Sequence, residues 1–266
     1  MIRKLSLAVL AASLLVPAAV VAQDAASSAS SGDAKTRTIL SHMPKEIVDC
    51  QPHDEAREAA DAKLTQTAWD LVNKHEIAAL GGMLPQLEAA AAHAPDKPSL
   101  PEKCDGKLIV YSDNMMDLIL AGGVARKAAG VSTVVQHPLL PYARLDFVIG
   151  WTYFELNRRD GAADWYHKGL LNNPRDPLLA SEYAGALAQA GRSADALAYV
   201  DTYMAENDDM RAPVRAAMLR RRGFALGELG RHQEAIAAYQ DSLKDDPASE
   251  VAKKEIQWNQ SKLGAH

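Results

Sequence analysis

The 34 residues Pro177–Met210, PLLASEYAGALAQAGRSADALAYVDTYMAENDDM, decide the fold, because the same pattern occurs before and after them. The other two copies begin at Ala143 and Ala216. In the alignment of the three copies, two positions hold small residues: Gly150, Ala184 and Gly223, and then Ala162, Ala196 and Ala235. Two other positions hold large apolar residues: Tyr153, Leu187 and Leu226, and then Tyr166, Val200 and Tyr239. Small residues let two helices approach closely and large ones fill the space between them, so each copy is predicted to be a pair of packed helices.

This pattern resembles the tetratricopeptide repeat, a helix–turn–helix unit that stacks into a solenoid. The resemblance covers residues 143–249, less than half of the 266-residue chain. It implies an all-α fold, a right-handed α-α superhelix of three repeats in residues 142–249, with a capping helix in residues 250–266. The first helix of each repeat is predicted to end at a residue that tolerates the left-handed backbone conformation: Asn157, Gly191 and Gly230. Ordinary antiparallel helices with a chance period are the alternative.

Three residues and an insertion depart from the family pattern. Asp146 stands where the family usually has a large apolar residue, Tyr203 where it has a small one, and Arg222 is also atypical. Five extra residues, Arg211–Arg215, separate the second repeat from the third. A bulky tyrosine followed by an insertion leads us to expect that this stacking step is opened or shifted.

The amino terminus has the pattern of a secretory signal peptide in residues 1–22. A basic start precedes the apolar run Leu5–Val16, and small residues precede a predicted cleavage site before Gln23. The run is shorter than the roughly 20 residues that span a membrane, so no stable anchor is expected after cleavage. An uncleaved anchor is the alternative. Residues 23–37 are rich in Ser and Ala and are predicted to be a flexible linker. The features together are those of an exported bacterial protein, and the predicted location is the periplasm.

The charge of the chain argues against a nucleic-acid partner. It has 29 basic and 34 acidic residues, and the predicted signal peptide holds two of the basic ones. Nonspecific nucleic-acid binding requires a basic surface, which a mature chain with a net negative charge does not supply.

Two cysteines, Cys50 and Cys104, lie before the repeats. An exported chain meets an oxidising compartment, so we expect a disulfide between them, with two free thiols as the alternative. Cys50 and His53 also have a metal-like spacing, but a structural zinc site needs four ligands and a catalytic one usually three from the protein. This pair is therefore interpreted as a loop cysteine near an exposed histidine, and no metal is expected.

Residues 38–141 are predicted to form a mainly helical region. Residues 38–50 are expected to hold a short helical turn. A helix is predicted to start at Asp54, and apolar residues at helical spacing predict a second helix over Ile77–Ala91. Pro85 and two glycines are expected to weaken or split that second helix. The two helices are interpreted as a helical hairpin.

The end of this region has two alternative interpretations. Residues 107–112 and 131–136 are short and β-branched, and they flank a predicted helix over residues 114–129. They either form two short paired strands, or residues 113–141 form a degenerate helical repeat that caps the solenoid.

The motif search indicates a protein that is not an enzyme. The chain has no HExxH zinc motif, no phosphate-binding loop, no dinucleotide fingerprint, no GxSxG elbow and no CxxCH haem attachment site. No catalytic residues and no cofactors are therefore expected.

The resemblance implies a partner-binding concave groove lined by the first helix of each repeat. The positions that correspond to it are Arg144, Phe147, Trp151, Phe154, Ser181, Arg220 and Phe224. Aromatic residues and arginine are enriched at binding hot spots. The alternative is that the aromatic residues of the first repeat belong to the core. The family's carboxylate clamp, made of Lys, Asn and Arg, is not supported because Phe147 and Trp151 occupy two of its positions, so an acidic chaperone tail is not the expected ligand.

The leading interpretation is an exported interaction module or scaffold that binds a protein or peptide partner. One rival is an enzyme or enzyme subunit with a site in residues 38–141, which a cluster of His53, His75, His93 or His137 with acids would favour. The other rival is a self-associating structural envelope protein. The sequence specifies neither the partner nor the oligomeric state.

Overall fold

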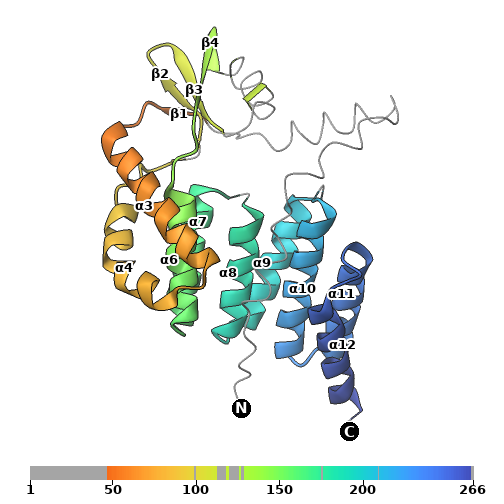
Figure 1. Cartoon of the computed structure of the whole chain (residues 1–266). Coiled ribbons are helices and arrows are strands. Elements are labelled where there is room, and N and C mark those ends of the chain that lie inside the picture. The colour runs from red at the N-terminus through yellow and green to blue at the C-terminus, as the bar shows by residue number, and fades with distance from the viewer. Residues whose placement is uncertain are drawn as a thin grey trace.

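The computed structural model describes residues 47–98, 100–112, 118–119, 126, 129–174, 176–208 and 210–264. The predicted signal peptide and linker lie outside the described residues. Within them the chain is mainly helical, with one small sheet. Figure 1 shows a row of helices with a helical hairpin at one end and the sheet beside that hairpin. None of the helices in the described part is both long and apolar enough to cross a membrane.

The hairpin consists of α3 (Glu55–Asn73) and α4 (Ile77–Ala91). The Asp54 side chain accepts a hydrogen bond from the Arg57 backbone N–H at 3.0 Å, which satisfies a donor that the first turn leaves free. His75 takes a positive φ of 56° in the turn between the helices. The expected hairpin is present, and α4 runs unbroken through Pro85 rather than splitting.

The sheet has four strands in the order β1 (Val48–Asp49), β2 (Glu102–Cys104), β3 (Lys107–Tyr111) and β4 (Thr133–His137). β3 and β4 pair in parallel, with Lys107 opposite Thr133. The paired-strand interpretation is therefore correct and the degenerate helical repeat is wrong. β2 and β3 form a hairpin whose two-residue turn, Asp105–Gly106, has φ values of 47° and 72°, as tight hairpin turns require. Of residues 38–50, where a short helical turn was expected, residues 38–46 lie outside the described residues, and β1 occupies Val48–Asp49.

Seven further helices follow the sheet in the part of the chain that the structure describes. They are α6 (Tyr142–Glu155), α7 (Arg159–Asn172), α8 (Pro177–Gln189), α9 (Ser193–Glu206), α10 (Ala212–Glu228), α11 (His232–Asp245) and α12 (Glu250–Leu263). The first six pair as α6–α7, α8–α9 and α10–α11, and α12 packs against α11. Each pair turns at a residue with positive φ: Asn157 at 63°, Gly191 at 81° and Gly230 at 74°. The predicted turn positions are confirmed.

Small residues allow the two helices of each repeat to touch. A Cβ atom on Gly150 would lie 2.8 Å from the Tyr166 ring, and one on Gly223 would lie 2.8 Å from the Tyr239 ring. Such distances are well inside van der Waals contact, so glycine is required where the partner is tyrosine. In the second repeat, Ala184 takes the place of the glycine and Val200 takes the place of the tyrosine. The larger residue on the first helix therefore faces a smaller side chain on the second.

The expected opening of the step between the second and third repeats does not occur, while the expected shift stays a prediction. Most of the five extra residues form the first turn of α10, and α10 packs against both α8 and α9. Buried Arg221 donates to Glu182 at 2.7 Å, which ties α10 to α8. Atypical Arg222 pairs with Asp201 of α9 at 2.7 Å. Polar contacts between neighbouring helices therefore hold this step together.

Candidate functional site

The predicted groove of the first repeat is filled by the chain itself. Phe147, Trp151 and Phe154 are 3%, 4% and 5% exposed. Trp69 of α3 packs on Phe147 with ring centroids 5.5 Å apart, and His75 meets Trp151 edge-on at 6.0 Å. The prediction that these three aromatics face a partner is wrong, because all three are buried and the α3–α4 hairpin packs on Phe147 and Trp151.

The other predicted groove residues do not form a continuous binding surface either. Arg144 is exposed, with its guanidinium 5.6 Å from the centre of the Trp69 ring. Ser181 is buried and accepts a hydrogen bond from Arg221 at 3.0 Å. Arg220 is buried and pairs with Asp246 at 2.9 Å, while half-buried Phe224 packs against the core. Most of these side chains therefore stabilise the stack.

A cavity of about 270 Å³ opens instead between α7 and α9, the second helices of the first two repeats. We call it the α7–α9 groove. Its lining is mainly apolar and comprises His167, Leu170, Leu171, Pro174, Tyr199, Thr202, Tyr203 and Glu206. Leu171 is 68% exposed, the largest value for a large hydrophobic side chain in the described part of the chain. The groove therefore exposes apolar surface that the fold leaves uncovered.

A row of rings supports one wall of the α7–α9 groove. Tyr183 of α8 stacks on His167 with centroids 5.5 Å apart and meets Tyr199 edge-on at 4.8 Å. Tyr203 continues the row, 6.0 Å from Tyr199. Burial raises the pKa of Tyr199 above its usual range, so this ring keeps a neutral hydroxyl. Sequence reasoning missed this surface because the family pattern drew attention to the first helix of each repeat.

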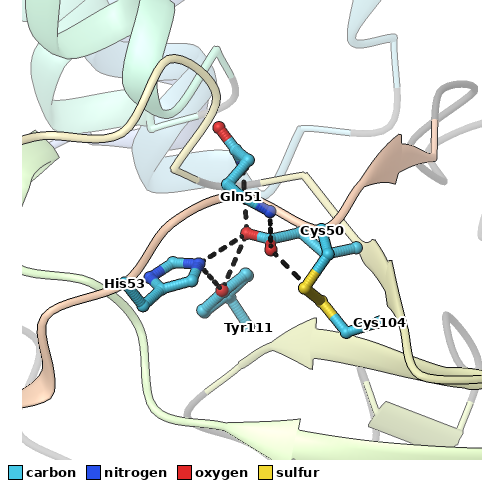
Figure 2. The surroundings of a disulfide bond; sticks show 6 residues. Cys50, Gln51, His53, Cys104 and Tyr111 are labelled. Carbon is cyan, nitrogen blue, oxygen red and sulfur yellow. Dashed lines mark hydrogen bonds and ion pairs between the residues drawn. A yellow bond between two sulfur atoms is a disulfide. The ribbon is translucent and has the colours of Figure 1, made fainter.

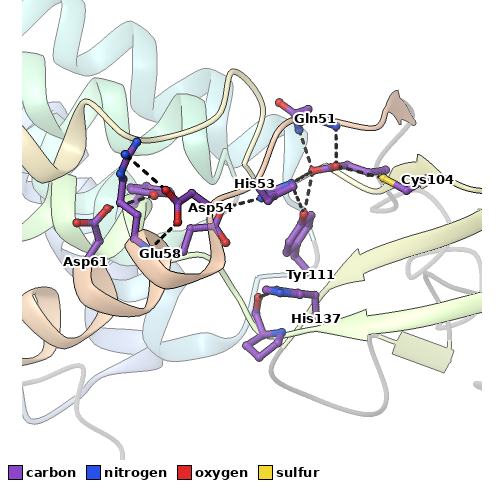
Figure 3. A network of polar contacts seen from close by, with 12 residues as sticks. Gln51, His53, Asp54, Glu58, Asp61, Cys104, Tyr111 and His137 are labelled. Carbon is purple, nitrogen blue, oxygen red and sulfur yellow. Dashed lines mark hydrogen bonds and ion pairs between the residues drawn. The ribbon is translucent and has the colours of Figure 1, made fainter.

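A second site, which is polar, lies where the sheet meets α3 (Figures 2 and 3). His53 joins two carboxylates: its Nδ1 lies 2.7 Å from Glu58 and its Nε2 lies 3.0 Å from Glu102. Glu102 is fully buried and also accepts from the Tyr111 hydroxyl at 2.8 Å and from the Gln51 backbone N–H at 3.0 Å. The buried charge is therefore compensated from several sides.

Opposing effects set the charge states of this site. Burial disfavours the cation of His53, but hydrogen bonds to Glu58 and Glu102 outweigh it and raise the pKa of His53. Burial likewise disfavours the carboxylate of Glu102, but hydrogen bonds from Gln51, Tyr111 and His53 outweigh it and lower the pKa of Glu102. Both directions favour an imidazolium held between carboxylates.

A pocket of about 190 Å³ adjoins this network and has a polar lining: Pro52, His53, Asp54, Arg57, Glu58, His93 and Tyr142. His93 pairs with Asp61 at 3.0 Å. His75 and His137 lie elsewhere, against Trp151 and Tyr111. Two of the four histidines named by the enzyme alternative thus share one pocket with acids. Because both ring nitrogens of His53 are already hydrogen-bonded, the geometry supports an ion-pair network better than a free general base.

The predicted disulfide is confirmed: Cys50 and Cys104 are bonded, with their Cα atoms 4.7 Å apart. The parallel pairing of β1 and β2 sets Asp49 opposite Lys103. The residues that follow them, Cys50 and Cys104, therefore lie side by side. Sequence reasoning missed the roles of Glu102 and Tyr111. The available signal was alternation, since residues two apart on a strand share a face and Glu102 precedes Cys104 by two.

No family model matches the chain. "Small glutamine-rich tetratricopeptide repeat-containing protein 2" of Mycosarcoma maydis is 34% identical over 104 residues, which are 39% of this chain. The match covers only 28% of that relative's length.

Two solved structures that are similar to the chain are also tetratricopeptide-repeat domains. The first TPR domain of human RPAP3 is 26% identical and aligns with 46% of this chain and 93% of its own, with a TM-score of 0.42. The Sgt2 TPR domain of Aspergillus fumigatus is 17% identical and aligns with 47% of this chain and 80% of its own, also at 0.42. The repeat period, the positive-φ turns and the similarity to this relative agree that the helical row of this chain is built of tetratricopeptide-type repeats.

Proposed function

We propose that the protein is an exported, non-enzymatic interaction module that binds a protein or peptide partner in the α7–α9 groove. The observation that carries the proposal is the exposed apolar lining of that groove, with Leu171 at 68% exposure beside a cavity of about 270 Å³. Concave apolar sites of this kind receive single anchoring side chains, and tyrosines are enriched among the residues that hold them.

The lining also indicates what the partner presents. Leu170, Tyr199 and Tyr203 surround the cavity with apolar surface, which favours an aliphatic or aromatic anchor. Glu206 is exposed at the rim, where a carboxylate attracts a basic group next to the anchor. We therefore propose a partner segment in which an apolar residue is flanked by lysine or arginine.

The hairpin explains why binding moves to this face. α3 and α4 cover the first helix of the first repeat, so the usual concave surface is part of the core. α7 and α9 are the second helices of their repeats, and Tyr183 of α8 contacts both of them, at His167 and at Tyr199. The apolar surface that stays exposed is therefore the one between the second helices, α7 and α9.

A matched pair of leucine substitutions tests the proposal. Leu171→Asp places a charge in the groove, whereas Leu263→Asp places one on a distant exposed leucine that also ends a helix. In both variants the new carboxylate lies near the carboxyl end of a helix, where a negative charge is unfavourable by about 0.3–1 kcal/mol. Peptides selected from a random library on the full chain should bind Leu263→Asp like wild type and lose about tenfold or more on Leu171→Asp. Equal binding to both variants refutes the groove.

We propose the periplasm as the place where this module works, on the basis of residues 1–22. The amino-terminal residue of the protein recovered from a cell fraction tests it. Recovery from the periplasmic fraction with Gln23 as the first residue supports export. Recovery of the intact chain from the cytosol contradicts it.

A second candidate is a small-molecule site in the polar pocket between α3 and the loop before it. The specific observation is the approach of His53–Glu58 and His93–Asp61 to one cavity. A thermal-shift screen of small anions and metabolites tests it. A hit that stabilises wild type but not His93→Ala favours this candidate, and a screen without hits removes it.

A further inference from the structure

The side chains that line the α7–α9 groove follow a helical spacing on both walls. On the α7 wall they stand at positions i, i+3, i+4 and i+7, the last of them just past the helix end: His167, Leu170, Leu171 and Pro174. On α9 they follow the same spacing: Tyr199, Thr202, Tyr203 and Glu206. Residues at these spacings share one face of a helix, so each wall presents a continuous stripe about two turns long.

Each stripe has a buried floor and an exposed rim. Leu170 and Tyr203 are buried, whereas their neighbours Leu171 and Thr202 are exposed. α8 packs against both α7 and α9, so the fold itself sets how far apart the two walls stand. Because the chain reverses direction at each turn between consecutive helices, α7 and α9 run in the same direction. The two stripes therefore lie along one common direction, with apolar surface between them.

We propose that the partner segment in this groove is an amphipathic helix, whose apolar residues recur at i, i+3 or i+4, and i+7 and are flanked by basic residues. The inference rests on the proposed function, since it concerns the same groove, and it adds the conformation of the partner. Side chains of one helix pack between those of its neighbours when the spacings of the two surfaces match. Recognition of a helix in an apolar groove uses anchors at these spacings.

The backbone of the walls favours a helix over an extended segment. The N–H and C=O groups inside α7 and α9 are used by the hydrogen bonds of the helices themselves. Pro174, at the end of the α7 wall, has no N–H to offer. An extended segment laid over these walls would thus find no main-chain partners of the kind that a sheet edge supplies. A helix satisfies its own backbone groups and needs only side-chain contacts.

Exposed carboxylates stand at both ends of the apolar stripes. Asp164 lies three residues before His167 on α7, and Glu206 is the last residue of α9. Asp195 of α9 is already paired with Arg192 at 3.0 Å, so its charge is balanced within the chain. Complementary charge at the rim of an interface steers a partner and fixes its register. Lysine or arginine at each end of the partner's apolar stripe therefore complements the groove.

Two peptide libraries, selected on the purified full chain, test the proposal. One library holds alanine-based helices that are closed by a staple and randomised along one face. The other holds linear segments of the same length with prolines spaced so that no helix can form. The helical library should yield binders with apolar residues at i, i+3 or i+4, and i+7 beside lysine or arginine. Their affinity should fall about tenfold or more on Leu171→Asp and stay unchanged on Leu263→Asp.

Two further measurements report the conformation and the charge of the bound segment. Proline at an outward-facing position in the middle of a selected helix, made without its staple, should weaken binding roughly 100-fold relative to alanine there. Glu206→Gln should weaken binding about two- to fivefold at low salt and less at high salt. Glu228→Gln is the matched control, because Glu228 is an exposed glutamate that ends α10, and it should bind like wild type.

The outcomes separate this inference from the proposed function. If only the proline-containing segments bind in a way that Leu171→Asp abolishes, or if a selected helix tolerates the proline, the helical partner is refuted and the groove stands. If neither library yields a binder sensitive to Leu171→Asp, both are refuted. Equal affinities of the Glu206 and Glu228 variants refute the basic flanks. Circular dichroism reports whether each variant is folded, and Thr202→Arg on the other wall keeps the test decisive if Leu171→Asp unfolds.

Discussion

Substitution of Gly223 by alanine adds one methyl group where the two helices of the third repeat touch. The new Cβ would lie 2.8–2.9 Å from three atoms of the Tyr239 ring, and that ring is 1% exposed, so it has no space into which to move. Overpacking of this kind costs about 1–3 kcal/mol. Alanine is also a better helix former than glycine by about 0.8–1.0 kcal/mol. The net loss of unfolding free energy is therefore about 0–2 kcal/mol.

Gly82→Ala is the matched control, because a Cβ on Gly82 within α4 meets no other atom within 4 Å. It should stabilise by about 1 kcal/mol through helix propensity alone. Urea denaturation of both variants gives a difference of about 1–3 kcal/mol, in which the propensity gain cancels. In the Tyr239→Val background, which imitates Val200 of the second repeat, Gly223→Ala should become stabilising. If Gly223→Ala stabilises wild type as much as Gly82→Ala does, the close-contact reasoning is refuted.

Three further predictions concern charge and redox state. Reduction of Cys50–Cys104 in metal-free buffer should lower the unfolding free energy by about 4 kcal/mol, because the bond spans 54 residues; a loss below about 1 kcal/mol in urea would contradict this. Burial raises the pKa of Asp146 to about 7, although Lys168 and Asn172 act to lower it. The folded chain therefore holds a proton that the unfolded chain loses above about pH 4, so the unfolding free energy falls as pH rises toward 7. Asp146→Asn should therefore gain on wild type between pH 5 and pH 8 in urea unfolding, by up to about 1.4 kcal/mol per pH unit, and a constant difference would refute this. The pKa of His53 is raised in the folded chain, so its contribution to stability is complete below the ordinary pKa of 6.5 and is lost as pH rises through the folded pKa. The pKa of Glu102 is lowered, so its contribution is complete above the ordinary pKa of 4.5 and is lost as pH falls through the folded pKa. The His53→Gln variant should thus be most destabilised near pH 5.5, and an equal deficit at pH 9 would contradict the assignment.

Local sequence rules were sufficient for the repeats. Turn residues such as Gly191 adopt positive φ because few other residue types tolerate it, and this requirement is visible in the sequence. Small Gly150 faces large Tyr166 because the two helices of the repeat touch at that point. The repeat period also predicts this pairing. The disulfide followed from the expected compartment and the count of cysteines.

The candidate sites depend on long-range packing that local periodicity does not encode. The helix that became α3 was predicted, but nothing in the sequence indicated that its hairpin covers Phe147 and Trp151. From the sequence alone, this face of the first repeat is compatible with a partner-binding groove and with a place in the core. Only the position of the hairpin decides between the two. His53 and Glu102 are 49 residues apart, and they meet because β1 pairs with β2. β1 has only two residues, too few for alternation to identify it as a strand.

Photocrosslinking at position 171 in the intact full chain tests most directly whether a partner occupies the α7–α9 groove. A photoreactive phenylalanine is introduced in place of Leu171, or of Leu263 as the control on another exposed leucine. The account predicts a discrete protein adduct from position 171 that disappears when Thr202→Arg blocks the groove, and no such adduct from position 263. Adducts of equal yield at both positions, or an adduct at 171 that persists with Thr202→Arg, would contradict it.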